Sequence, residues 1–218
     1  FGPIKFPYPV PFRLLNDEAK GWLDITYLSP RVRIARGNKG TLFVLKKEPT
    51  AVENLVATIE EGQGESGEEV LAAIEALASG NRQSSADTLK FLEGEWKLKW
   101  TSQAASASGL QKFATGFDNF QVIGSSGKAL DTLENVAKFL PFLVLRAKAE
   151  CEQDAEDKTR FNVLIQGATL EVGSLEIPLN FIKGTGYLEV LYVDEDIRIS
   201  KGSKGSMFVH TRSNLLQQ

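Results

Sequence analysis

Side chains that commonly do chemistry are scarce in this chain. It has one cysteine, Cys151, and one histidine, His210, among 218 residues. A lone cysteine cannot close an internal disulfide, and one histidine cannot supply a His-rich zinc site. The acidic run at 194–196 is more typical of a turn than of a catalytic pair, because aspartates bond their own backbone. We therefore predict no catalytic residues, no metal site and no certain cofactor.

Two glycine-rich segments could in principle hold a phosphate, at 37–40 (Gly-Asn-Lys-Gly) and 202–205 (Gly-Ser-Lys-Gly). Neither has the Gly-Lys-[Ser/Thr] order or the following helix of a P-loop. The Gly-x-x-Gly clamp of KH modules needs helical flanks, whereas these flanks alternate like strands. The balance of charges beyond residue 50 is acidic, which disfavours a polyanion. We expect tight hairpins here, and no nucleic-acid partner.

The same glycine segments belong to an internal repeat. Residues 21–47 align without a gap to residues 186–212, with ten identities in 27 positions. Each copy alternates apolar and polar residues in three short stretches, which predicts three antiparallel strands.

The region between the copies carries helix signals and then strand signals. Capping boxes at 50–53 and 66–69 precede apolar residues at helical spacing, which predicts a helical hairpin that ends at Gly80. A third helix is predicted over 130–140, closed by Pro141. The predicted strands are 95–101, 117–123, 142–151, 160–166 and 169–175.

These elements together define the fold class and the domains. We predict a mainly β protein with N-terminal helices, in which a lipocalin-like antiparallel β-barrel follows a partial β module. The partial module, 1–48, would be the last strands of a first copy, and 49–218 the complete domain. A fragment of three strands exposes its edges, so we expect it to pack on the complete domain, on a partner or on upstream residues.

The local pattern with most structural content is Gly94-Glu95-Trp96, because Gly-x-Trp opens the first strand of lipocalin barrels. Its indole would plug the floor of the barrel under an arginine from the last strands. Arg198 and Arg212 are the candidates for that arginine.

The barrel interior is the candidate ligand site. A barrel of eight strands is either filled by its side chains or holds one small apolar ligand, and both alternatives stay open. The alternation places these residues inside: Trp96, Leu98, Trp100, Phe120, Leu145, Phe161, Val163, Val190 and Tyr192.

Motifs at both ends of residues 53–213 resemble the plastid lipid-associated protein family, also called PAP/fibrillin. They are LEGEWKLKWTS at 92–102 and GYLEVLYVDEDIRISKGSKGSMFV at 186–209. Trp100 stands where the family has tyrosine, and Lys201 where it has arginine. The first copy has Ser29 and Arg31 in place of the acidic pair. The matching residues include the structural positions Gly94, Trp96, Asp194, Asp196, Arg198, Gly202 and Gly205.

The resemblance implies a function as well as a fold. It implies a non-enzymatic, peripheral chloroplast protein at the thylakoid or plastoglobule, which binds or organises carotenoids, quinones or galactolipids. The paired copies resemble the longer, double-module members of the family. The alternative is a scaffold that docks on a thylakoid protein complex, with no ligand in the barrel.

The first copy offers separate candidates for contact with lipid headgroups or a protein partner. Its basic cluster is either a solvated strand surface or a site that attracts anionic groups and weakens as salt rises. The proline-rich start of the chain would present aromatic side chains in extended form. These candidates are Arg31, Arg33, Arg36, Lys39, Phe6, Tyr8 and Phe12.

Overall fold

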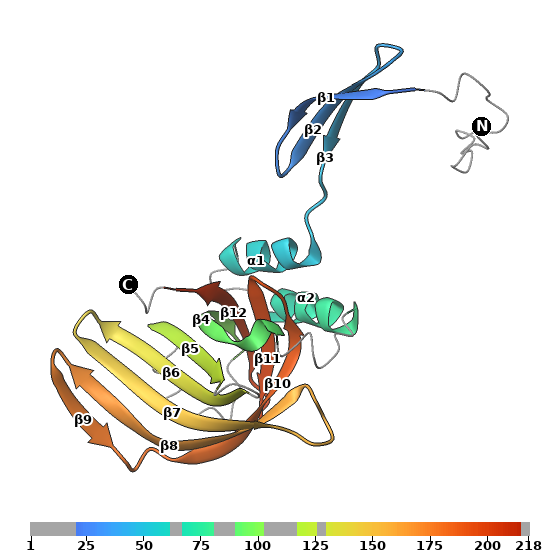
Figure 1. Cartoon of the computed structure of the whole chain (residues 1–218). Helices are drawn as coiled ribbons and strands as arrows, with labels where there is room; N and C mark the ends of the chain where they lie inside the picture. The colour runs from blue at the N-terminus through green and yellow to red at the C-terminus, as the bar shows by residue number, and fades with distance from the viewer. Residues whose placement is uncertain (1–20, 62–66, 81–89, 103–116, 126–129, 215–218) are drawn as a thin grey trace. The chain divides into compact units, whose positions relative to one another are not determined.

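The computed structural model describes residues 21–61, 67–80, 90–102, 117–125 and 130–214. The chain divides into two compact units, Phe1–Thr50 and Ala51–Gln218. The positions of the two units relative to one another are not determined (Figure 1).

The first unit contains one antiparallel sheet, which we call the first sheet. Its strands are β1 (Leu23–Leu28), β2 (Val32–Gly37) and β3 (Leu42–Lys46), in the order β1-β2-β3. The hairpin between β2 and β3 turns at Gly40, whose φ of 84° is a conformation that glycine adopts without strain. The three strands predicted from the repeat are therefore present.

The second unit begins with two helices, α1 (Ala51–Glu61) and α2 (Gly67–Gly80), and continues as an antiparallel sheet (Figure 1). The sheet order is β10-β11-β12-β4-β5-β6-β7-β8-β9. The bounds of its strands are β4 (Gly94–Thr101), β5 (Asp118–Ser125), β6 (Leu130–Leu140), β7 (Leu143–Gln153), β8 (Arg160–Val172), β9 (Leu175–Leu179), β10 (Gly184–Val193), β11 (Ile197–Gly202) and β12 (Met207–Ser213).

The sheet of the second unit curls into a ring. The first part of β8 also pairs with β10, from Arg160↔Glu189 to Ile165↔Gly184, and this pairing closes the ring. The rest of β8 continues past this closure and carries β9 on its edge. The prediction was a mainly β protein with N-terminal helices and a lipocalin-like antiparallel β-barrel. The structure confirms the mainly β class and the antiparallel sheet, which curls into a ring.

The helix predicted over 130–140 is wrong, because these residues form β6. This strand lies between β5 and β7 and pairs with both along most of its length. Leu133 and Ala137 are buried on one face and Val136 on the other. Burial on both faces produces a spacing that resembles a helix, and the sheet overrides the local preference.

The predicted strands 160–166 and 169–175 are also corrected. The structure has one strand, β8, which continues past Gly167 with a register shift opposite Lys148 and Ala149. The turn comes later, at Gly173, whose φ is 61°.

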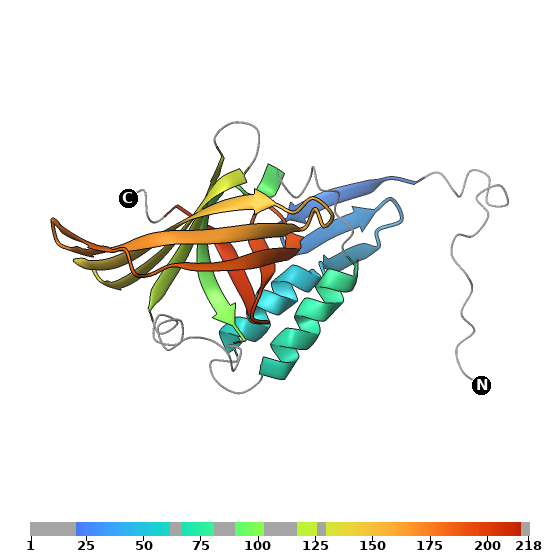
Figure 2. The same cartoon turned by 90° about the horizontal axis from the view of Figure 1, so that it is seen from below.

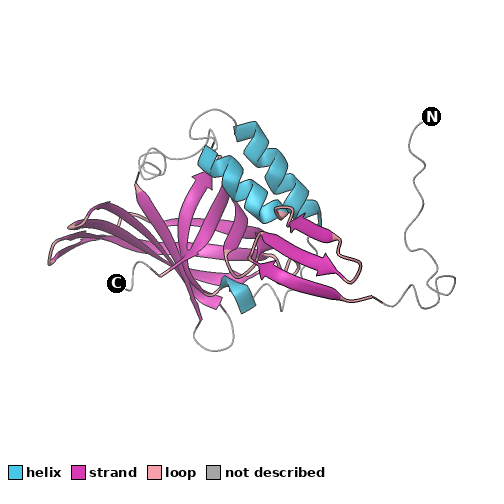
Figure 3. Ribbon diagram, turned by 90° about the horizontal axis from the view of Figure 1, so that it is seen from above, coloured by secondary structure: helices cyan, strands magenta, loops and turns pink. Residues whose placement is uncertain are grey.

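The helical hairpin packs on the outer face of the ring. Leu55 of α1 and Ile74 of α2 form a core with Ile199 of β11 and Val209 of β12, all fully buried. Figures 2 and 3 show the two helices side by side on one side of the sheet. Neither helix in the described residues is long and apolar enough to cross a bilayer.

Candidate functional site

The floor of the ring is built around Trp96 on β4. Its indole is fully buried and donates from Nε1 to the carbonyl of Leu92, 2.9 Å away. Gly94 has a φ of 127°, and a Cβ there would lie 2.6 Å from Nη1 of Arg212. Two properties of glycine are therefore needed at this position. It adopts the positive φ without strain, and it has no Cβ that would collide with the guanidinium of Arg212.

Both predicted arginines lie over the Trp96 ring. The Cζ of Arg212 is 3.9 Å from the ring centroid and that of Arg198 is 5.2 Å from it. Arg212 also donates to the carbonyls of Phe91 (2.7 Å), Glu93 (2.6 Å) and Glu195 (3.0 Å). The bonds to Phe91 and Glu93 satisfy carbonyls at the end of the helical turn at 90–92, which lack intrahelical donors, and the bond to Glu195 ties this turn to the loop before β11.

Above the floor lies a set of polar side chains that we call the polar cluster. Arg198 donates to the side-chain carbonyl of Gln121, and Gln121 donates to Asn135 at 2.9 Å. Arg198, Ser200 and His210 are all buried. The cluster consists of Gln121, Asn135, Arg198, Ser200 and His210.

The polar cluster is incompletely bonded. Within the described residues, no hydrogen-bond partner reaches Nε or Nη1 of Arg198, Oγ of Ser200 or Nδ1 of His210. Burial, with a smaller contribution from Arg212, lowers the pKa of Arg198 to about 9. Burial and the charge of Arg198 hold the pKa of His210 well below its usual value, so the imidazole is neutral.

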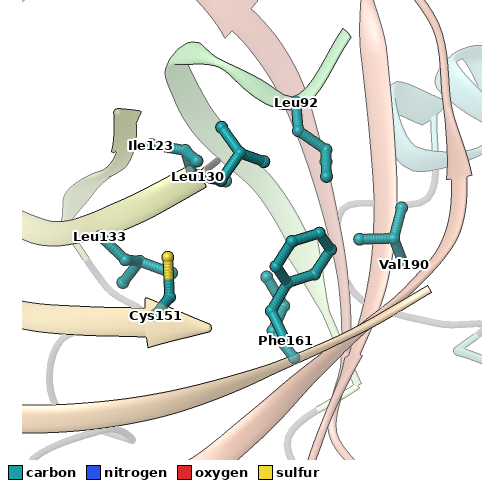
Figure 4. Close-up of a pocket in the computed structure, with 8 residues that line it drawn as sticks. Leu92, Ile123, Leu130, Leu133, Cys151, Phe161 and Val190 are labelled. Atoms are coloured by element: carbon teal, nitrogen blue, oxygen red, sulfur yellow. The ribbon is translucent and has the colours of Figure 1, made fainter. Parts of the chain in front are cut away.

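A small apolar cavity lies beside the floor. Its volume is about 10 Å³, close to the space that one water molecule needs. Figure 4 shows Leu133, Cys151, Phe161 and Val190 among the side chains that line it. Burial raises the pKa of the Cys151 thiol to about 11, so this cysteine stays protonated. The cavity is too small to enclose a carotenoid or a quinone.

Most of the residues predicted inside the ring share the face of Trp96. Phe161 and Val190 pack in the same buried cluster as Trp96, and Val163 packs against the neighbouring cluster with Cys151. The strand registers place Leu98 and Leu145 on this face as well.

Trp100, Tyr192 and Phe120 do not lie inside the ring. Trp100 and Tyr192 pack against the core beneath the helices. In each strand a β-bulge adds one residue, Lys99 in β4 and Leu191 in β10, which turns the next side chain to the opposite face.

Phe120 is misplaced for a simpler reason. It lies one residue from the inward-facing Gln121 and packs with Val136 and Val144 on the opposite face. The prediction assigned it to the wrong parity of its strand.

Sequence reasoning missed an apolar surface on β7, β8 and β9, where these strands extend past the closure of the ring. In one row Leu143, Val172 and Leu175 lie directly opposite one another. In the next row Leu145, Leu170 and Ile177 do the same. We call these six residues the apolar sheet face. Leu175 is 60% exposed and Ile177 38%, and the other four are also partly accessible.

The other face of the same strands carries a network of ion pairs. Arg146 donates to Glu171 at 2.6 Å and lies 3.4 Å from Glu134. The end of the sheet is therefore amphipathic, with aliphatic rows on the inner side and an ion-pair network on the outer side. The signal was present in the sequence as alternation at 143/145, 170/172 and 175/177, but only the register shows that the rows coincide.

The basic candidates of the first sheet are exposed, and they do not form one surface. Arg33 and Arg36 lie on opposite faces of β2, and Lys39 lies in the hairpin. Arg31 lies in the turn before β2. The candidates Phe6, Tyr8 and Phe12 lie outside the described residues.

The acidic turn before β11 is stabilised by hydrogen bonds to the carboxylate of Asp194. Oδ1 of Asp194 accepts from the backbone N–H groups of Asp196 (2.9 Å) and Ile197 (2.8 Å). Its other oxygen accepts from the hydroxyl of Tyr192 at 2.8 Å, and burial, more than this bond, raises the pKa of that hydroxyl to about 12. Within the described ranges, no three His, Cys, Asp or Glu side chains group as metal ligands would.

Comparisons with known proteins agree with the motifs and the architecture. The PAP_fibrillin family model matches residues 3–46 and 53–211. Probable plastid-lipid-associated protein 12, chloroplastic, from Arabidopsis thaliana is 38% identical over 214 residues, which cover 97% of this chain and 49% of that protein. The chain thus spans about half the length of this relative.

Two shorter matches are also to chloroplastic proteins. Probable plastid-lipid-associated protein 11, chloroplastic, from Arabidopsis thaliana is 29% identical over 150 residues, 67% of this chain and 68% of that protein. A light-induced chloroplastic protein from Solanum tuberosum is 48% identical over 46 residues, 21% of this chain and 12% of that protein. No solved structure matches. The chain belongs to the PAP/fibrillin family of plastid lipid-associated proteins.

Proposed function

We propose that this protein is a non-enzymatic, peripheral lipid-associated protein of the chloroplast. It would contact hydrophobic lipids at the thylakoid or plastoglobule surface through the apolar sheet face. The observation that carries this proposal is the amphipathic end of the sheet, where exposed aliphatic rows on β7–β9 lie opposite the network of Arg146 and Glu171.

The energy of such a contact is adequate for peripheral association. Burying apolar surface contributes about 25 cal/mol per Å², so covering about 200 Å² of this face contributes on the order of 5 kcal/mol. Exposed apolar patches of a few hundred Å² are typical of interaction sites. Orientation and partial desolvation reduce the net value, which favours reversible binding.

The cavity volume bears on where a lipid would lie. A space of about 10 Å³ cannot enclose a polyene or an isoprenoid chain. We propose that carotenoids, quinones or galactolipids are held against the open apolar sheet face, as part of a lipid surface.

A vesicle flotation assay with matched variants tests the proposal. The double variant Leu175→Glu/Ile177→Glu should lose most of its binding to galactolipid vesicles, because two charges would enter the apolar contact. The control is Leu164→Glu, since Leu164 is also exposed, at 46%, but lies on the outer face of β8. Equal flotation of both variants and the unaltered protein would rule out the apolar sheet face as the contact.

A second candidate function is docking on a thylakoid protein complex through the first sheet. Both faces of this sheet carry exposed apolar side chains, including Ile25 and Phe43 on one and Tyr27 and Val44 on the other. Ile25→Lys/Phe43→Lys should then reduce recovery of a fixed protein companion from thylakoid extract. Unchanged recovery, together with vesicle binding, would favour the lipid function alone.

A further inference from the structure

We propose that the polar cluster inside the ring is a binding site for the carboxylate of a long-chain aliphatic acid. Arg198 would supply the charge, with Ser200 and His210 beside it. The observation behind this is a fully buried guanidinium with two nitrogens, Nε and Nη1, that have no acceptor in the described residues. Such groups are rare, because a buried donor without a partner has lost its hydrogen bonds to water without replacement, and the cost is larger when the donor is charged.

The three groups lie on the same face of two neighbouring strands. Arg198 and His210 are direct cross-strand partners on β11 and β12, and Ser200 follows Arg198 by two residues on one face of β11. The orphan atoms Ser200 Oγ and His210 Nδ1 therefore lie in the same interior as the free guanidinium nitrogens. One small group with several lone pairs can accept from both the guanidinium and the hydroxyl.

The charge balance favours an anion over a neutral group. Arg212, the other arginine over Trp96, is compensated by the acidic turn, since Asp194 and Asp196 raise its pKa against the effect of burial. In the part of the chain that the structure describes, the charge that shifts the pKa of Arg198 is that of Arg212, which has the same sign. A buried cation without a counter-ion is costly, and a bound carboxylate would remove that cost.

The internal repeat shows that the three-stranded unit itself forms without these two polar groups. Ala35 and Leu45 occupy in the first sheet the places of Ser200 and His210, on strands with the same register. The arginine is common to both copies, as Arg33 and Arg198. The second copy therefore differs by two polar side chains that point to the interior beside a shared arginine.

The inner face also provides a place for the alkyl tail. From Asn135 of the polar cluster, the row across the sheet continues through Ala147 and Ala168. Ala137 in the next row lies opposite Leu145, which begins the apolar sheet face. Small side chains therefore occupy the inner face between the carboxylate site and the apolar sheet face, and the alkyl tail would lie along them. The placement of the tail rests on the proposed function, whereas the carboxylate site rests on the interior alone.

Binding of laurate and of 1-dodecanol, measured by calorimetry, tests the inference on the full chain. The two probes share a chain of the same length and differ in the charged head. Laurate should bind at least ten-fold more tightly than the alcohol, and Arg198→Met should abolish that preference. The matched control is Arg33→Met, which removes the same residue type from the first sheet and should leave the preference unchanged.

A second variant keeps the test decisive if Arg198→Met does not fold. Ser200→Ala/His210→Leu copies the residues of the first sheet, and it removes two unpaired polar groups without removing the buried cation. It should fold as stably as the parent and reduce the preference for laurate several-fold. Equal binding of the two probes to the parent, no laurate binding at all, or full preference in the double variant would overturn the inference.

The outcomes separate this inference from the proposed function. Loss of vesicle flotation in Leu175→Glu/Ile177→Glu, with laurate preference absent, would leave the lipid-surface function standing and remove the carboxylate site. Laurate preference that depends on Arg198, with flotation unaffected by the charges at 175 and 177, would support the carboxylate site and rule out the apolar sheet face as the lipid contact.

Discussion

The first sheet and the strands β10–β12 have the same local structure and different surroundings. Both contain a β-bulge at the same place, after Ile25 in β1 and after Val190 in β10. The hairpin glycines Gly40 and Gly205 have φ angles of 84° and 85°. Even the turn before the second strand is conserved in form, because Ser29 Oγ accepts from Val32 as Asp194 Oδ1 accepts from Ile197.

Burial separates the two regions. In β10–β12 the inner face lies over Trp96 and the outer face lies under the helices, so Ile199 and Val209 are fully buried. In the first sheet the equivalent valine, Val44, is 64% exposed. A three-stranded sheet thus acquires its turns, bulge and register from its own sequence, whereas its stability depends on the elements that cover it.

The largest expected difference in the free energy of unfolding is between substitutions at Val209 and at its repeat equivalent, Val44. Val209→Ala should lower the free energy of unfolding by about 2.5 kcal/mol, since two buried methyl groups are lost and a cavity remains. Val44→Ala, at the matching exposed position, should leave it unchanged within error. Urea unfolding followed by circular dichroism measures both. Similar losses in the two variants would mean that the first sheet is covered in solution.

The arginine at the end of β12 should give the next largest effect. Arg212→Ala removes three bonds to backbone carbonyls and the contact with Trp96, and we expect a loss of about 2 kcal/mol in the same assay. Its repeat equivalent is Lys47, which is exposed. Lys47→Ala is therefore the control, and an equal effect there would contradict the assignment of Arg212 to the floor.

The polar interior of the second copy predicts a pH dependence. The folded protein holds His210 neutral, with a pKa well below 6.5, while the unfolded chain takes up a proton near that pH. Stability should therefore fall by about 1 kcal/mol as the pH drops from 6.5 to 5.5, because the unfolded state binds more protons in this window.

His210→Leu, which copies Leu45, should remove that dependence. His210 is the one histidine of the chain, so no other imidazole contributes. Asp154 and Asp157 have lowered pKa values and stay ionised at both pH values. An unchanged pH dependence in His210→Leu would show that another group is responsible.

The smallest expected effect on stability comes from the hairpin glycines, and it should be equal in the first sheet and in β10–β12. Gly40→Ala and Gly205→Ala each place a side chain at a positive φ in an open hairpin, with no steric contact for the new Cβ. The cost is about 1 kcal/mol of backbone strain in each case. Hydrogen exchange of the amides in each hairpin should report equal losses of protection. Unequal losses would show that tertiary packing also acts on these turns.

Much of the fold could be predicted because it depends on local sequence patterns. The repeat, the glycine hairpins, the helical hairpin and the Gly94–Trp96 motif depend on neighbouring residues and on spacing. The predictions that failed involve β6, where burial on both faces imitates a helix, and the bulges that redirect Trp100 and Tyr192. A bulge becomes visible only when the partner strand is known.

The candidate sites also combine features that could be predicted from the sequence with features that only the tertiary structure shows. The sequence by itself determined the family motifs, the paired copies and the arginines over Trp96, since each is a matter of residue type at a fixed interval. The tertiary structure alone decided that Leu170, Leu175 and their neighbours form one apolar face, and that Arg198 is buried with no counter-ion among the described residues. Both of these properties arise from strands far apart in sequence, whose register and closure are set by packing in three dimensions.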